Sequence, residues 1–291
     1  MEQLSLLELD RLEEPGLDDE QHVARLAQKI VVDLGLRPPI NHEVVASFQG
    51  ITEIRTTGAD DWAGCLVRDA RGLIIYLRAS DGWRRQRYTT CHEVGHTFLP
   101  GFAVQTQFRC APSLGQAKRQ EERLSDAAAG ELLFPKPFFL ADLEQASFGL
   151  DAVEDLADSY DASLAATAHR FVALWPEDCL LVILEPMLKP ADRFEEAPEP
   201  RLRVVYSIHR GSWPYLPRFK SADEGSKLAA ALDGEIVEGL GHGLDGLVPD
   251  FKGPAQVSAR LLPYRDERGT EHRRVLALYR KPPTTANGRA S

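Results

Sequence analysis

The stretch from His92 to His96 constrains this chain more than any other, because it reads His-Glu-Val-Gly-His. Residues four apart lie on one face of an α-helix, so a helix here would bring the two imidazoles close enough to hold one metal ion. Zinc suits such a pair, and Glu93 would lie beside it, able to take a proton from an activated water molecule. The competing interpretation is a chance occurrence on a surface helix, so the stretch needs support from its surroundings.

The surrounding sequence supports a helical setting. The run from Trp83 to Cys91 contains neither Gly nor Pro, and Asp81 is expected to cap its N-terminus. A second helix is expected from Glu121 to Leu133, because this run is rich in Ala and Leu, begins with glutamates and is followed by Pro135. A zinc hydrolase needs a third protein ligand and an open position for water. The carboxylates of this second helix are candidates for that ligand.

Taken together, two motifs resemble those of the ImmA/IrrE metallopeptidases. The first is Arg-Tyr-Thr at residues 87–89 ahead of His-Glu-x-x-His, and the second is Glu-x-x-x-Asp-x-Ala-Ala-x-x-Leu-Leu-x-Pro at residues 122–135. In that family, the third zinc ligand is the glutamate four residues before the Asn or Asp of the second motif. This position is Glu122 here, and not its neighbour Glu121. The resemblance therefore implies a zinc site formed by His92, His96 and Glu122, with Glu93 as the general base.

Two further residues are candidates for roles at this site. Asp126 follows Glu122 by one helical turn, so it could hydrogen-bond a ligating histidine; it could equally be a carboxylate on the helix surface. Cys110 lies in the loop between the two helices. Its thiolate could fill the open zinc position and hold the enzyme inactive, because thiolate is a better zinc ligand than water. The alternative is a small apolar residue buried under the loop, as free cysteines usually are.

The resemblance also implies a function. Such enzymes cleave a helix-turn-helix repressor encoded nearby, in response to stress or DNA damage, and their longer branch carries a GAF-like domain after the peptidase domain. We therefore expect a site-specific zinc endopeptidase acting on a transcriptional repressor. The alternative is a non-proteolytic regulator that binds DNA through a helical pair, within residues 151–175, and a ligand through its C-terminal domain.

The chain as a whole has the composition of a globular protein. It has 291 residues, of which 43% are hydrophobic and 27% charged. No apolar run approaches the roughly 20 residues that span a bilayer, and the acidic N-terminus lacks the basic region of a signal peptide. The four cysteines form no Cys-x-x-Cys pair and are expected to be reduced thiols. These features predict a cytoplasmic protein with no membrane association.

We expect an α+β fold, with a mostly helical zincin-like domain that contains a small β-sheet, followed by a smaller α/β, GAF-like domain. The expected parts are an acidic extension at 1–19, the metallopeptidase domain at 20–185, a Pro-containing linker at 186–200, the sensor domain at 201–281 and a disordered tail at 282–291. A continuous apolar run at 179–184 indicates a buried strand just before the linker.

The charge distribution bears on possible ligands. The formal net charge is −10, which argues against a general nucleic-acid binder. Residues 201–281 nevertheless contain 14 Lys and Arg against 10 Asp and Glu. This excess is either ordinary surface variation or a sign that the C-terminal domain binds an anionic signal such as single-stranded DNA. The second helix of the 151–175 pair offers only His169 and Arg170 to read bases, so we favour a structural pair over a DNA reader.

Overall fold

The computed structural model of the chain describes residues 4–58, 62–102, 107–109, 116–194, 196–251, 253–265 and 270–282. It separates into two units, one of Met1–Gln145 with Asp155–Ser163, the other of Ala146–Glu154 with Leu164–Ser291. Each unit contains helices and its own β-sheet, so the expected mixture of α and β structure is confirmed. In the described segments, no helix combines the length and the apolar character that crossing a bilayer requires.

Three capped helices begin the first unit: α1 (Leu6–Glu13), α2 (Asp19–Asp33) and α3 (His42–Phe48). Ser5 and Asp18 each form a capping box with the third residue of the helix that follows, and Asn41 accepts two backbone amides. Helix α1 falls within the segment expected as an acidic extension. It is held because Leu7 is buried and its amide donates to the carbonyl of Phe98, 2.9 Å away.

The first unit contains a four-stranded sheet in the order β1-β3-β2-β4. Its strands are β1 (Ile51–Thr57), β2 (Gly64–Asp69), β3 (Gly72–Arg78) and β4 (Gln107–Arg109). Strands β2 and β3 form a hairpin, β1 pairs with β3 in parallel, and β4 pairs with β2 in the antiparallel sense.

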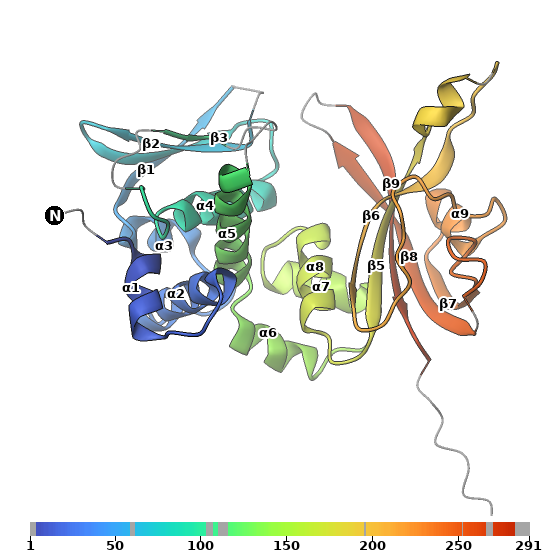
Figure 1. The fold of residues 1–291 in the computed structure, drawn as a ribbon, viewed down its shortest axis with the longest axis horizontal. Helices are drawn as coiled ribbons and strands as arrows, with labels where there is room; N and C mark the ends of the chain where they lie inside the picture. The colour runs from blue at the N-terminus through green and yellow to red at the C-terminus, as the bar shows by residue number, and fades with distance from the viewer. Residues whose placement is uncertain are drawn as a thin grey trace, which may run out of the picture. The chain divides into compact units, whose positions relative to one another are not determined.

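Four more helices follow: α4 (Trp83–His96), α5 (Gln116–Leu133), α6 (Lys136–Leu143) and α7 (Leu150–Ser159). Figure 1 shows α4 under the sheet and beside α5, and α4 contacts both β2 and β3. The expected N-cap of α4 is wrong by one residue. Gly82 occupies that position, and Asp81 instead pairs with Arg78 and Arg85.

The second unit is built on a five-stranded antiparallel sheet in the order β6-β5-β9-β8-β7. The strands are β5 (Cys179–Met187), β6 (Arg201–Arg210), β7 (Val237–His242), β8 (Pro254–Arg265) and β9 (Glu271–Arg280). Helix α8 (Leu164–Leu174) lies on one side of this sheet and α9 (Lys227–Leu232) on the other (Figure 1). Since β5 is covered on both faces, its continuous apolar run is buried throughout.

These units differ from the boundary expected at residues 186–200. Strand β5 was expected at the end of the first domain, but it hydrogen-bonds to β6 and β9 and so lies within the second sheet. Part of the expected linker forms a short 3-10 helix, η1 (Pro190–Phe194), which is attached to β6 by an ion pair between Asp192 and Arg203. The prolines of this segment indicate a domain linker, whereas buried polar contacts make it a structured part of the second unit.

Candidate metal centre

Helix α4 carries the His-Glu-x-x-His stretch in its last turns and is buried along that part. Residues 89–96 are all buried. The guanidinium of Arg87 anchors the helix, donating to the carbonyl oxygens of Ile40, at 2.9 Å, and Asp161, at 3.1 Å. Its third contact is with the His42 ring, whose pKa is lowered by burial and then by the charge of Arg87. The first arginine of the family-like motif thus ties α4 to α3 and to the turn after α7.

Gly95 allows α5 to approach α4 closely. A Cβ atom at this position would lie 2.9 Å from the Cβ of Ala128 and from the backbone of Ser125. No side chain could be accommodated there without moving one of the two helices. The glycine inside the His-Glu-x-x-His stretch therefore sets the distance at which the carboxylates of α5 face the histidines of α4.

The structure brings together His92, His96 and Glu122, as expected from the motifs. The Oε2 atom of Glu122 lies 3.1 Å from Nε2 of His92 and 3.9 Å from Nε2 of His96. One donor atom from each residue falls within 4.8 Å of the other two, and the two histidines are almost fully buried. Ligand atoms around a tetrahedral zinc ion are separated by about 3.3 Å, so these two imidazoles and one carboxylate fit zinc without rearrangement of the backbone.

Asp126 lies against the outer side of His92. Its Oδ1 atom is 2.8 Å from Nδ1 of the imidazole and also accepts a hydrogen bond of 2.9 Å from the Tyr88 hydroxyl. A carboxylate on Nδ1 favours the tautomer that leaves Nε2 available to a metal, and this contact is the basis for a role of Asp126 in orienting His92. Tyr88 was missed as a site residue. It precedes His92 by one helical turn, and this spacing is the signal that could have identified it.

Glu93 is fully buried beside the three donor residues. Burial raises its pKa to about 7, the charge of His92 opposes this effect, and that of Glu122 adds to it. Neither carboxylate oxygen accepts a hydrogen bond of normal geometry from the described residues, although the Leu66 amide is near enough to favour the charged form. Across from it is Gly64 of β2, where a Cβ atom would lie 2.8 Å from Oε1 of Glu93. The carboxylate thus has little freedom and is protected from bulk water.

Two cysteines, Cys91 and Cys110, lie near the candidate site along the sequence. Cys110, expected as a possible regulatory ligand, lies outside the described residues. Cys91 is buried within α4, and burial raises the pKa of its thiol to about 12. This side chain is therefore a neutral packing residue.

Comparisons with known proteins bear on the fold and on the candidate site residues. No curated protein matches the chain. A solved transcriptional regulator from Mycobacterium tuberculosis is similar in fold, with a TM-score of 0.60 and 12% identity, covering 89% of this chain and 76% of that one. At this identity the likeness concerns the fold alone. Residues 49–172, which include all the candidate site residues, match the family model of the IrrE N-terminal-like domain of the M78 peptidases, and this match supports the resemblance to the ImmA/IrrE family that the two motifs indicated.

Proposed function

We propose that this protein is a cytoplasmic, site-specific zinc endopeptidase that cleaves a helix-turn-helix transcriptional repressor in response to stress or DNA damage. The observation that carries the proposal is the convergence of His92, His96 and Glu122, with Glu93 buried beside them. The match of residues 49–172 to a peptidase family supports the same chemistry. Repressor cleavage and its trigger follow from the resemblance to the ImmA/IrrE family.

The residues of the chain have distinct roles in this proposal. His92, His96 and Glu122 would hold zinc, which supplies a Lewis acid that activates water and polarises a peptide carbonyl. Glu93 takes a proton from the attacking water and delivers it to the leaving amine. Asp126 holds the ring of His92 through Nδ1, and Tyr88 in turn orients Asp126. The peptide carbonyl would bind at the zinc position that the three protein ligands leave open.

The second unit is proposed to be a GAF-like sensor that binds an anionic signal, such as single-stranded DNA, and controls the peptidase. Its antiparallel sheet between α8 and α9 supports the GAF-like fold. The excess of Lys and Arg in residues 201–281 supports an anionic ligand. Contacts with phosphates release counterions, so binding of such a signal should weaken as salt concentration rises.

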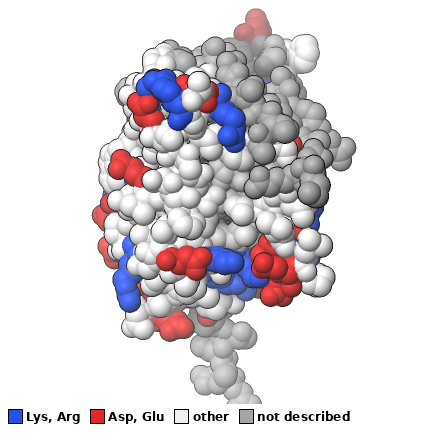
Figure 2. Space-filling model, turned by 90° about the vertical axis from the view of Figure 1, so that its left-hand side faces the viewer, with Lys and Arg blue, Asp and Glu red and all other residues white. Residues whose placement is uncertain are grey.

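The structure offers little support for the alternative of a DNA-binding regulator. Helix α8, the candidate recognition helix, buries Thr167, Ala168, Phe171 and Val172, and His169 contacts the hydroxyl of Tyr206 on β6. A helix used in this way cannot present these side chains to a DNA groove. On the face shown in Figure 2, basic side chains lie beside acidic ones in small groups separated by wide uncharged areas. Among the described residues of that face, the basic side chains form no continuous surface for DNA.

The test is incubation of the purified protein with the repressor encoded beside it, with and without single-stranded or damaged DNA. Fragments of defined mass, formed only when zinc is present, would support the proposal and identify the cleaved bond. The Glu93→Gln protein serves as the matched control. An intact repressor after incubation with the zinc-loaded wild-type protein, under every inducing condition, would contradict the proposal.

A thiolate gate at Cys110 remains part of the proposal. If Cys110 restrains the enzyme, Cys110→Ser should raise cleavage in the absence of inducer while the zinc content stays unchanged. Equal basal cleavage by the variant and the wild type would assign Cys110 to packing only.

A further inference from the structure

The connection between β5 and β6 is organised around a buried ion pair. Asp192 and Arg203 are 3% and 5% exposed, and Nη2 of Arg203 lies 2.8 Å from Oδ2 of Asp192. Asp192 also accepts the backbone amide of Lys189, at 2.9 Å, and Arg203 donates to the carbonyl oxygens of Met187 and Phe219. Because both charged groups also form hydrogen bonds with the backbone, the ion pair holds the start of β6 against the turn that precedes it.

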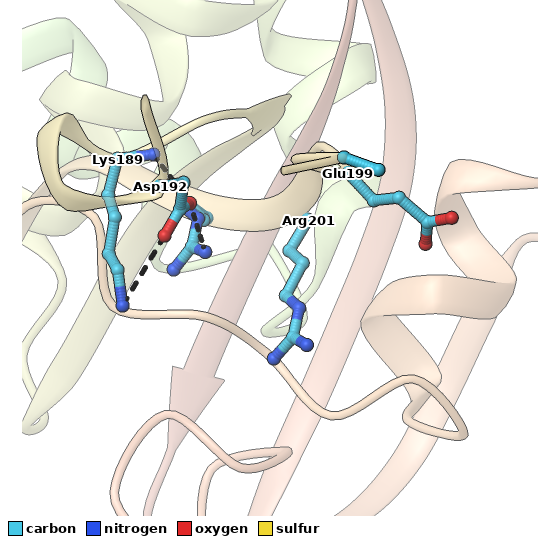
Figure 3. Close-up of a pocket in the computed structure, with 6 residues that line it drawn as sticks. Lys189, Asp192, Glu199 and Arg201 are labelled. Carbon is cyan, nitrogen blue, oxygen red and sulfur yellow. Dashed lines mark hydrogen bonds and ion pairs between the residues drawn. The ribbon is translucent and has the colours of Figure 1, made fainter. Parts of the chain in front are cut away.

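A cavity of about 200 Å³ lies over this ion pair. Its lining consists of Lys189, Asp192, Ala197, Glu199, Arg201 and Arg203 (Figure 3). Only Ala197 among these is apolar, so the cavity does not suit an apolar ligand. Three cationic side chains face two carboxylates, which leaves one positive charge in excess.

The excess charge is located on Lys189 and Arg201. Arg203 is neutralised by Asp192 and uses its guanidinium on protein acceptors. The Arg201 side chain forms no ion pair or hydrogen bond with any described residue. Lys189 is 44% exposed, and its Nζ atom lies 3.5 Å from Asp192. Figure 3 shows the Lys189 and Arg201 side chains extending to the same side, while Glu199 points away from them. The cavity therefore presents two cations with donors to spare.

We propose that this cavity is a binding site for a phosphate group, held between the ammonium of Lys189 and the guanidinium of Arg201. The planar fork of arginine matches two phosphate oxygens, and lysine adds a compact charge with rotatable donors. The buried Asp192–Arg203 pair fixes the backbone that carries both cations, so little ordering is needed on binding. The site belongs to the second unit alone and does not depend on the proposed proteolysis.

Calorimetric titration of the full-length protein with inorganic phosphate, in a low-salt buffer free of other oxyanions, tests this proposal. Lys189→Gln and Arg201→Gln should each weaken binding about tenfold, which corresponds to the loss of one charge-assisted hydrogen bond. Arg210→Gln is the matched control, because it removes the same charge from the other end of β6 and should bind phosphate as the wild type does. The Lys189 and Arg201 side chains are at least partly exposed, so their variants should remain folded, and thermal melting checks this.

The source of the phosphate is distinguished by a second titration with an oligothymidylate that lacks terminal phosphates. Oligonucleotide binding that phosphate displaces and Arg201→Gln weakens would assign the site to the backbone of single-stranded nucleic acid. Binding of inorganic phosphate alone would assign it to a small phosphorylated molecule. No phosphate binding by the wild type, or equal affinities in the wild type and the two cavity variants, would overturn the proposal.

Discussion

At the scale of single residues, the roles of Glu93 and His92 can be separated by experiment. Glu93→Gln keeps the shape of the side chain but cannot accept a proton, so cleavage should fall about a hundredfold or more while zinc binding persists. His92→Ala should instead lose the metal. Zinc content measured beside the rate of repressor cleavage distinguishes the two effects. Wild-type cleavage by Glu93→Gln would show that another group takes the proton.

Asp126 is expected to act through His92. Because its carboxylate lies on Nδ1 of that ring, Asp126→Ala should weaken zinc affinity about 10- to 100-fold. Asp126→Asn, which retains an acceptor, should lie between the alanine variant and the wild type. Competition with a chromogenic chelator measures the affinity, and Glu121→Ala controls for loss of one negative charge from the same helix. If Asp126→Ala binds zinc as tightly as this control, Asp126 is only a surface carboxylate.

Asp245, in the second unit, makes stability depend on pH. Burial raises the pKa of its carboxyl, and the hydrogen bond from the Tyr279 hydroxyl opposes the shift. A raised pKa means that the folded state binds the proton more tightly than the unfolded state. This contribution to stability is therefore complete below the usual pKa of Asp and is lost as pH rises through the raised value.

Asp245→Asn removes this titration and should be tolerated at a positive φ of 56°. The Tm of the wild type relative to that of the variant should therefore decrease as the pH is raised from about 4 to 7. Thermal melts across this range provide the measurement. A Tm difference that is constant or increases with pH would contradict the assigned shift.

At the scale of elements, the metal centre depends on the close approach of α4 and α5 at Gly95. Alanine usually stabilises a helix by about 1 kcal/mol relative to glycine, but here its Cβ would overlap Ala128 and Ser125. Gly95→Ala should therefore lower the Tm and weaken zinc binding, because Glu122 moves away from the histidines. Gly130→Ala in α5 is the control, since a Cβ there meets nothing within 4 Å, and it should raise the Tm. If Gly95→Ala and Gly130→Ala have the same Tm and the same zinc affinity, the close approach of α4 and α5 at Gly95 is not needed for stability or for zinc binding.

Elements formed by local sequence patterns could be predicted, whereas features that depend on contacts between residues far apart in the sequence could not. The pattern of His92, Glu93 and His96 and the buried run of β5 are local features, and the sequence predicted both elements correctly. The contact of Gly64 with Glu93 joins a strand to a helix, and no local pattern reports it. The same holds for Asp192 and Arg203, whose burial converts an expected linker into a structured connection. Long-range packing decided these cases.

At the scale of the whole molecule, the two units interlace along the chain, and this determines where the chain can be cut. The first unit needs residues 155–163, because Tyr160 is buried, its hydroxyl donates to Asp142, and the Asp161 carbonyl accepts from Arg87. A cut after residue 145 would remove these contacts. A cut after residue 195 would keep β5 but remove its neighbours β6 and β9, exposing residues 180–184, which are at most 1% exposed in the intact chain.

We therefore predict that a fragment ending at Ser163 is monomeric and binds one zinc ion, whereas fragments ending at 145 and 195 do not behave in this way. The fragment ending at 145 should melt at a lower temperature than the fragment ending at Ser163. It lacks the buried ring of Tyr160, the Tyr160 hydroxyl that donates to Asp142 of α6, and the Asp161 carbonyl that accepts from Arg87 of α4. The fragment ending at 195 should aggregate, because an unpaired strand that is apolar on both faces pairs with other chains. Size-exclusion chromatography, zinc content and thermal melting of the three fragments make the comparison. A soluble, monomeric, zinc-loaded fragment ending at 195 would contradict the prediction that β5 needs β6 and β9 to stay in solution.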